Sequence, residues 1–245
     1  AEIAVYRVYI YLVVLLKLIH GSLARIYKPV VSELISSGNE QEVRNTYRRI
    51  SKWVLLVTCW GAVIIFLYGK PLLGLFFPEN YIQNSAALLI LTAGTFLNAA
   101  FGPEGMSLQA YGNTKLILIN SLVMVVTNLG LGLWLVPDYG IVGAAAATAA
   151  ALSLGAFLGF LEIRILHQMQ PFSVDTLKIF LVGSASALLM SGIQGWMVVD
   201  QGWFVVLEVL FLTGIYFLGL YITNSLDEVE WEIVRNIWKK AVNSK

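Results

Sequence analysis

The stretch GIVGAAAATAAALSLG, residues 140–155, is dominated by glycine and alanine and follows the segment LWLVPDY, residues 133–139. Small residues recur there at intervals of four, which places them along one face of an α-helix. This small-residue face comprises Gly143, Ala147, Ala151, Gly155 and Gly159. In a membrane the hydrophobic effect does not drive helices together, so close backbone approach at small side chains supplies the attraction. The stretch therefore predicts a transmembrane helix that packs tightly against its neighbours.

The composition of the whole chain indicates the same environment. Of its 245 residues, 58% are hydrophobic and 13% are charged, whereas a soluble domain carries about 25% charged residues. A helix needs roughly 20 mostly apolar residues to cross a bilayer. Seven windows meet this need: 3–24, 53–77, 82–100, 116–136, 141–166, 177–199 and 203–222. We therefore expect an all-α, polytopic membrane bundle of about seven transmembrane helices.

Local signals refine where these helices end. The segment GKP, residues 69–71, is expected to end the second helix, so that the following LLGLFF would be re-entrant. The segment PDYG, residues 137–140, predicts a tight turn, and the helices on either side of it would then form a hairpin. Gly102 and Pro103 are expected to break the third helix and to place Glu104 at a new helix start. Such a break can line a cavity or act as a hinge, and Glu104 can equally be a helix N-terminal charge with no role in transport.

The basic residues predict the orientation of the chain. If the connection after the first window is cytoplasmic, Lys70 is the only basic residue in an outside loop, which is the arrangement that the positive-inside rule selects. This orientation places the C-terminus in the cytoplasm and the protein in the cell membrane. The cytoplasmic segments then hold thirteen basic residues: Arg25, Lys28, Arg44, Arg48, Arg49, Lys52, Lys115, Arg164, Lys178, Arg235, Lys239, Lys240 and Lys245.

Two segments outside the windows have amphipathic patterns. Residues 39–53 begin with Asn39 as a helix cap and carry Val43, Tyr47 and Ile50 at helical spacing. Residues 225–240 form the second segment. Either segment can lie on the inner leaflet and regulate assembly, or it can be a solvated helical end whose apolar seam packs on the protein.

The segment LVPDYGIVGAAAAT, residues 135–148, resembles the P-x-Y-G-x-x-G-A-A-x-A-T signature of the multidrug/oligosaccharidyl-lipid/polysaccharide (MOP) exporter superfamily, in its polysaccharide-transporter branch. Further segments agree in order, among them YKPVVSELISSGN, PLLGLFFPENY and LLILTAGTFLNAAFGPEGMSLQAYGNTK, so that the resemblance spans residues 3–166. It implies a transporter with two six-helix lobes around a central cavity, followed by two extra helices. This chain would then supply helices eight to fourteen and need the N-terminal lobe of the same protein as its partner. The implied division is a C-terminal lobe (1–166), two additional transmembrane helices (167–222) and an amphipathic cytoplasmic tail (223–245).

Ionisable groups within a span are costly, so each one is a candidate functional residue. Arg7 and Lys17 lie in the first window, and Tyr6, Lys17 and Lys28 recur every eleven residues, which places these three on one stripe of a helix. A basic stripe suits a cargo that carries phosphate, and the resemblance implies the same cargo, a polyprenyl-diphosphate sugar. Arg7 can instead extend to the outer headgroups.

The remaining candidates are polar residues of the same windows. The candidate substrate contacts are Tyr11, Asn98, Asn120 and Asn128, although amides within a span also bridge helices. His20 and Glu104 are candidates for proton or ion binding, with a packing role as the alternative for His20.

The sequence favours a flippase of lipid-linked oligosaccharide, working by alternating access in the assembly of surface polysaccharide or other glycans, over three other classes. A cation-coupled drug antiporter would need intramembrane carboxylates, whereas the first window offers cations; a structural scaffold gives no reason for a buried lysine. A glycan polymerase or ligase would need a large outside loop, and neither H-E-x-x-H nor D-x-D occurs in the chain. Cys59 is the only cysteine, and P-loop and G-x-G-x-x-G patterns are absent. We therefore expect no enzyme activity, metal, cofactor or nucleic acid partner, and coupling, if any, to H⁺ or Na⁺.

Overall fold

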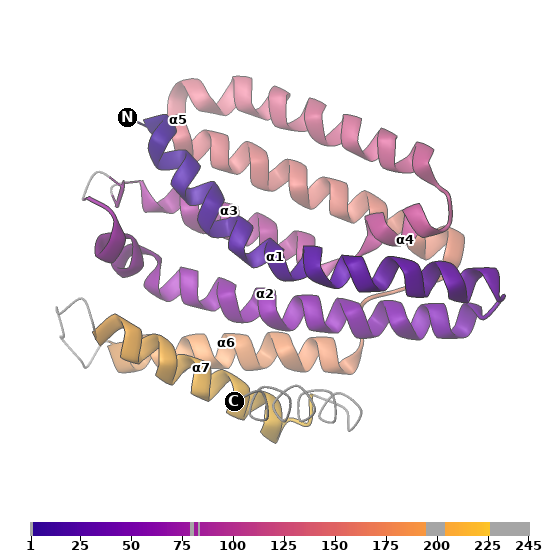
Figure 1. Ribbon diagram of the computed structural model, residues 1–245. Helices are drawn as coiled ribbons and strands as arrows, with labels where there is room; N and C mark the ends of the chain where they lie inside the picture. Colours follow the sequence, from indigo (N-terminus) through magenta and orange to yellow (C-terminus); the bar gives the residue numbers. More distant parts are fainter. Residues whose placement is uncertain (1, 79–80, 83, 195–203, 226–245) are drawn as a thin grey trace, which may run out of the picture.

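The computed structural model describes residues 2–78, 81–82, 84–194 and 204–225, and in these residues the regular structure is helical (Figure 1). The all-α class is therefore confirmed. The helices are α1 (Glu2–Ser36), α2 (Glu40–Phe76), α3 (Ser85–Ala100), α4 (Glu104–Ala110), α5 (Thr114–His167), α6 (Val174–Gln194) and α7 (Phe204–Ile222).

The lengths and apolar composition of these helices fit a membrane. Of the described helices, α2, α5, α6 and α7 are long and apolar enough to cross one, and the bent pair α3–α4 adds a fifth if it is counted as one span. The long helix α5 holds two of the predicted windows, and α1 covers the window 3–24 without a break. The chain is therefore a multi-pass membrane helix bundle.

The predicted hairpin is present inside α5. Residues 114–139 and 141–167 run back along each other as two arms (Figure 1), and Gly140, with φ 54° and ψ −131°, is the non-helical residue between them. Only glycine adopts this backbone conformation readily. The predicted turn of four residues is thus too long, because Pro137 stays inside the first arm and Gly140 alone reverses the chain.

The small-residue face of the second arm is buried along its whole length. A Cβ atom at Gly143 would collide with the backbone carbonyl of Leu135 in the first arm, so the two arms meet at backbone distance. On α3, a Cβ atom at Gly94 would lie 2.5 Å from the Cα and Cβ of Ala149. The second arm therefore packs closely against both the first arm and α3, while a role in motion for the small-residue face stays a prediction.

The prediction that α2 ends at residues 69–71 is wrong, because the helix continues through Pro71 to Phe76. Tyr68 and Leu73 are both buried on either side of Pro71. Packing on the two flanks supports the helix where the proline removes a backbone hydrogen bond, and transmembrane helices commonly tolerate proline in this way.

The first turns of α2 correspond to the first amphipathic segment, residues 39–53. They are capped at their start, and their apolar side is buried. The side chain of Asn39 accepts the backbone N–H of Glu42 at 3.3 Å. Val43 and Tyr47 are completely buried in a cluster with Tyr27 of α1, together with side chains of α4 and α5. This segment is therefore a helical end whose apolar seam packs on the protein. Of the second amphipathic segment, residues 226–240 lie outside the described part of the chain.

The break predicted in the third helix is present, since α3 ends at Ala100, α4 begins at Glu104 and the two are bent by 40°. Gly102, with φ 81°, and Pro103 lie between them and are buried. Whether this break acts as a hinge stays a prediction.

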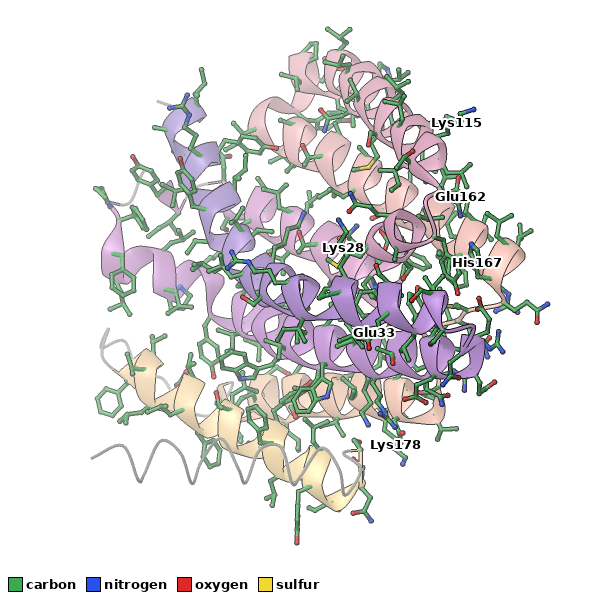
Figure 2. All side chains as sticks on the ribbon, turned by 45° about the vertical axis from the view of Figure 1, so that its right-hand side comes forward. Lys28, Glu33, Lys115, Glu162, His167 and Lys178 are labelled. Atoms are coloured by element: carbon green, nitrogen blue, oxygen red, sulfur yellow. The ribbon has the colours of Figure 1, made fainter. Side chains whose placement is uncertain are left out.

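Charged side chains gather toward one end of the bundle (Figure 2). They come from both ends of α5, from the second half of α1 and from the start of α6. The labelled residues there are Lys28, Glu33, Lys115, Glu162, His167 and Lys178. Lys70 lies near the other end of α2. The charged end and the end that carries Lys70 therefore lie apart, and which of them faces the cytoplasm stays a prediction.

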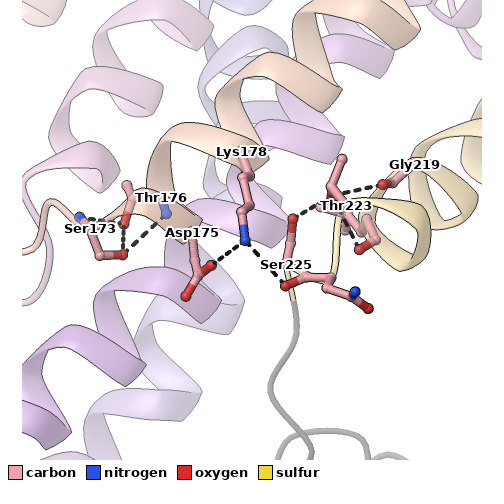
Figure 3. Close-up of polar contacts among 9 residues, drawn as sticks. Ser173, Asp175, Thr176, Lys178, Gly219, Thr223 and Ser225 are labelled. Carbon is pink, nitrogen blue, oxygen red and sulfur yellow. Dashed lines mark hydrogen bonds and ion pairs between the residues drawn. The ribbon is translucent and has the colours of Figure 1, made fainter.

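Helices α6 and α7 form a pair that packs on α2. The Tyr216 hydroxyl donates to the carbonyl of Leu56 at 2.9 Å, and the Trp60 indole N–H donates to the Thr213 hydroxyl at 3.1 Å. The start of α6 and the end of α7 are joined by a polar cluster (Figure 3), in which Lys178 donates to Asp175 at 3.0 Å and to the Asn224 carbonyl at 3.5 Å. Hydrogen bonds to α2 therefore hold the α6–α7 pair to the rest of the bundle, and the polar cluster joins the two helices to each other at one end.

Candidate functional site

A groove of about 420 Å³ lies between α1 and the two arms of α5. Three polar side chains in its wall form a connected cluster. The Tyr6 hydroxyl lies 3.0 Å from the Thr148 hydroxyl and donates to the carbonyl of Ala144 at 3.3 Å, and the Asn128 amide donates to Thr148 at 3.1 Å. The remaining lining of this α1–α5 groove is apolar or small: Leu129, Gly132, Leu133, Val136, Pro137 and Ala147.

The helix α1 is buried on one face and open on the other. Val5, Tyr9 and Val13 are buried against α2, α3 and α5, whereas Arg7 and Tyr11 are exposed on the opposite face. This face is where the sequence predicted substrate contacts. Because the buried residues recur at intervals of four, they fix the rotation of α1 and hold the exposed face outward.

Lys17 stands at the border between these two faces of α1. Its side chain is half-buried, and it forms no hydrogen bond or ion pair with any residue that the structure describes. Lys28, on the same stripe, is exposed. Tyr6 thus lies in the α1–α5 groove and Lys28 at the charged end, while a basic stripe that joins them past Lys17 stays a prediction. The side chain of His20 lies outside the described part of the chain.

Each of the three predicted amides bridges either two helices or the two arms of α5. Asn98 donates to the carbonyl of Leu152 at 3.5 Å, and buried Asn120 donates to the Glu162 carboxylate at 2.7 Å. Asn128 alone lines the α1–α5 groove. The structure therefore brings Asn128 together with Tyr6 but places Asn98 and Asn120 in other helix contacts, and a role for any of them in binding substrate stays a prediction.

Two polar residues, one in the α1–α5 groove and one toward the charged end, were missed from the sequence. Thr148 is the centre of the polar cluster, and Glu162 is a half-buried carboxylate of the second α5 arm. Glu162 could have been found because it is an ionisable residue inside a predicted span. Thr148 had no comparable signal, since its role depends on α1 approaching α5 from a distant part of the sequence.

At the charged end, three contacts join Tyr111, Glu40, His167 and Asn113 into one cluster. Its hydroxyl donates to Glu40 at 2.7 Å, and its ring stacks on His167 with centroids 3.5 Å apart. Burial raises the pKa of Tyr111, and the hydrogen bond to Glu40 raises it further. Asn113 contacts the same histidine ring at 3.1 Å. This cluster ties the start of α2 and both ends of α5 together.

Metal chemistry has no evident site in the part of the chain that the structure describes. No three His, Cys, Asp or Glu side chains lie close enough there to hold a metal ion. Cys59 is buried against α6, where its thiol contacts the carbonyl of Ile179 at 4.0 Å.

The chain matches one protein-family model and is similar to curated proteins. The family model MatE matches residues 3–134, just over half of the chain. The chain is 26% identical over 167 residues to the "Probable low-salt glycan biosynthesis flippase Agl15" of Haloferax volcanii, covering 67% of this chain and 34% of that protein. It is 32% identical over 124 residues to the "Putative O-antigen transporter" of Shigella flexneri, covering 49% of this chain and 30% of that protein.

Among solved structures, the fold is similar to "Lipid II flippase MurJ, inward closed conformation", with a TM-score of 0.74. The similarity covers 91% of this chain and 47% of that one, at 19% sequence identity. The chain thus spans about a third of the curated relatives that it matches and about half of this structural neighbour.

Proposed function

The chain belongs to the MatE family, and on that premise we propose that it is part of a flippase that moves a lipid-linked oligosaccharide across the cell membrane by alternating access. The names of the two curated relatives, a glycan biosynthesis flippase and an O-antigen transporter, support this proposal. The chain would supply the C-terminal lobe, helices eight to fourteen, and the two trailing helices α6 and α7. The other lobe of the same protein would close the cavity.

The observation that carries the proposal is the state of Lys17. A cation that is half-buried in a helix of a membrane bundle, with no ion pair to any described residue, is unfavourable unless an anion passes beside it. Arg7 lies about 15 Å from it along the axis of α1 at the usual rise per residue. Two cations at this spacing on one helix can attract a diphosphate and hand it along the cavity wall.

An apolar groove beside α6 supports a lipid cargo. It has a volume of about 580 Å³ and is lined by residues of α2, α3 and α6, including Phe96, Leu97, Leu177 and Phe180. Leu97, Leu177 and Phe180 are exposed, so the groove opens to the surrounding lipid. The polyprenyl tail would remain on this lipid side while the headgroup crosses in the cavity.

The proposal is transport and not an enzymatic reaction, and the names of the relatives support that choice at the level of the class. We propose that the charged end of the bundle, where α7 also ends, faces the cytoplasm, as the positive-inside rule favours. Coupling of transport to H⁺ or Na⁺ is part of the proposal.

A flipping assay on the full-length protein tests the role of Lys17. Lys17→Met keeps a long apolar side chain and removes the charge, whereas Lys17→Arg keeps the charge. Lys70→Met is the matched control, because it removes a charge near the end of α2, away from Lys17. At matched expression we expect Lys17→Met to lose outward accumulation of lipid-linked sugar, while Lys17→Arg and Lys70→Met retain it. Accumulation at the wild-type level in Lys17→Met would remove the assigned role.

A further inference from the structure

Glu104 is a carboxyl group inside the bundle that the proposed transport does not yet use. Glu104 is the first residue of α4, directly after the break. The helix ends at Ala110, about 9 Å further along its axis. Its side chain is half-buried against α5, where a Cβ atom at Gly159 would lie 2.5 Å from the Glu104 Cγ. The carboxyl therefore occupies space that a glycine in α5 leaves open.

Among the residues that the structure describes, the groups that face Glu104 carry no positive charge. On α2, buried Tyr47 lies within electrostatic reach of Glu104 and donates its hydroxyl hydrogen to the Phe101 carbonyl at 2.9 Å. On α1, the Tyr27 hydroxyl pairs with Ser107 at 2.6 Å. The helix α3 has no titratable residue.

On α5, the acidic residue nearest to Gly159 is Glu162, which is already engaged by Asn120 at 2.7 Å. Within the described residues, no lysine, arginine or histidine forms an ion pair with Glu104. The donor acting on its carboxyl is its own backbone N–H.

An ionised carboxylate that is half-buried inside the bundle and has no cation beside it is less favourable than one in water, and binding one proton removes its charge. We propose that Glu104 is a proton-binding site, neutral while α4 and α5 enclose it and ionised when α4 moves away from α5 and exposes it to water. The step transfers one proton between water and one carboxyl oxygen. The proposal that Glu104 binds a proton rests on its geometry alone. The proposal that this proton drives transport of the cargo rests on the proposed flippase function.

The first test is infrared difference spectroscopy of the purified full-length protein. At about neutral pH, where an ordinary glutamate is ionised, we expect a carbonyl band of a protonated carboxylic acid that moves in D₂O. Glu104→Gln should lose this band, while Glu33→Gln, at an exposed position of α1, should keep it. Absence of the band in the wild type, or its persistence in Glu104→Gln, would overturn the proposal.

A pair of glycine variants tests the geometry. Gly159→Ala places a methyl group against the Glu104 side chain, and Gly105→Ala, in the next position of α4, meets no atom within 4 Å. We expect Gly159→Ala to shift the midpoint at which the carboxylic acid band titrates, and Gly105→Ala to leave it in place. Equal midpoints in both variants would contradict the enclosure of Glu104 by α5.

Flipping in proteoliposomes with and without a proton gradient tests the use of the site. We expect the wild-type rate to respond to the gradient and the rate of Glu104→Gln to lose that response. An equal response in both would overturn proton coupling through Glu104. If the wild type flips no lipid-linked sugar at all, the proposed function fails, whereas the infrared result still decides the proton site.

Discussion

The contact between Gly94 of α3 and Ala149 of α5 offers the sharpest test of the packing. A methyl group at position 94 would lie 2.5 Å from the Cα and Cβ of Ala149, whereas non-bonded carbon atoms are comfortable at about 3.5–4.0 Å. Gly94→Ala must therefore separate the two helices by about 1 Å or distort them. Forcing an extra methyl group into a packed interior costs roughly 1–3 kcal/mol.

The matched control is Gly130→Ala, since a Cβ atom at Gly130 meets nothing within 4 Å. Both substitutions improve helix propensity by about the same amount, up to about 1 kcal/mol, so this term cancels in the difference between them. We expect Gly94→Ala to be less stable than Gly130→Ala by about 1–3 kcal/mol, or roughly 2–4 °C in melting midpoint for each kcal/mol in a unit of this size.

The assay is thermal unfolding of the full-length protein in detergent, followed by tryptophan fluorescence. Adding Ala149→Gly to Gly94→Ala removes one of the two atoms that collide, so the double variant should recover part of the loss. Equal midpoints for Gly94→Ala and Gly130→Ala would refute the backbone contact between α3 and α5. No recovery in the double variant would place the strain elsewhere.

Three further predictions concern α2 and its neighbours. A Cβ atom at Gly183 would touch the Cys59 sulfur, so Gly183→Cys should form a disulfide with Cys59 under mild oxidation; mass spectrometry checks it, and two free thiols would contradict it. Tyr216→Phe loses the hydrogen bond to the Leu56 carbonyl and should destabilise the protein by about 0.5–1.5 kcal/mol in chemical unfolding, with an unchanged stability as the opposing result. Asn39→Ala removes the α2 cap at a cost of about 1 kcal/mol, and faster amide exchange confined to the first turn of α2 would show it.

Features that depend on neighbouring residues in sequence could be predicted. The α5 hairpin follows from Gly140, whose backbone conformation is available only to glycine, and the break after α3 follows from Gly102 and Pro103. The cap at Asn39 likewise needs only its own side chain and the next turn. The end of α2 could not be predicted, because Pro71 usually stops a helix. The burial of Tyr68 that supports the helix there comes from other helices, which the local sequence does not show.

The candidate site divides in the same way. The sequence indicated that α1 carries unusual cations, since a lysine within an apolar window stands out without any structure. It could not indicate that Tyr6 contacts Thr148, 142 positions away. Nor could it indicate that Asn98 bonds the Leu152 carbonyl whereas Asn128 bonds the Thr148 hydroxyl. A helical period fixes which residues share a face but leaves open which neighbour that face meets.

The stiffness of this unit limits where transport motion can occur. A backbone-distance contact at Gly94 joins α3 to the second arm of α5, another at Gly143 joins the two arms to each other, and the Tyr216 hydrogen bond holds the trailing pair to α2. A packed core of this kind has discrete arrangements and does not deform smoothly. Under the proposed function, the large displacement between inward and outward states therefore falls between this unit and the other lobe, so that the exposed face of α1 with Arg7 moves with the unit as a rigid wall of the cavity.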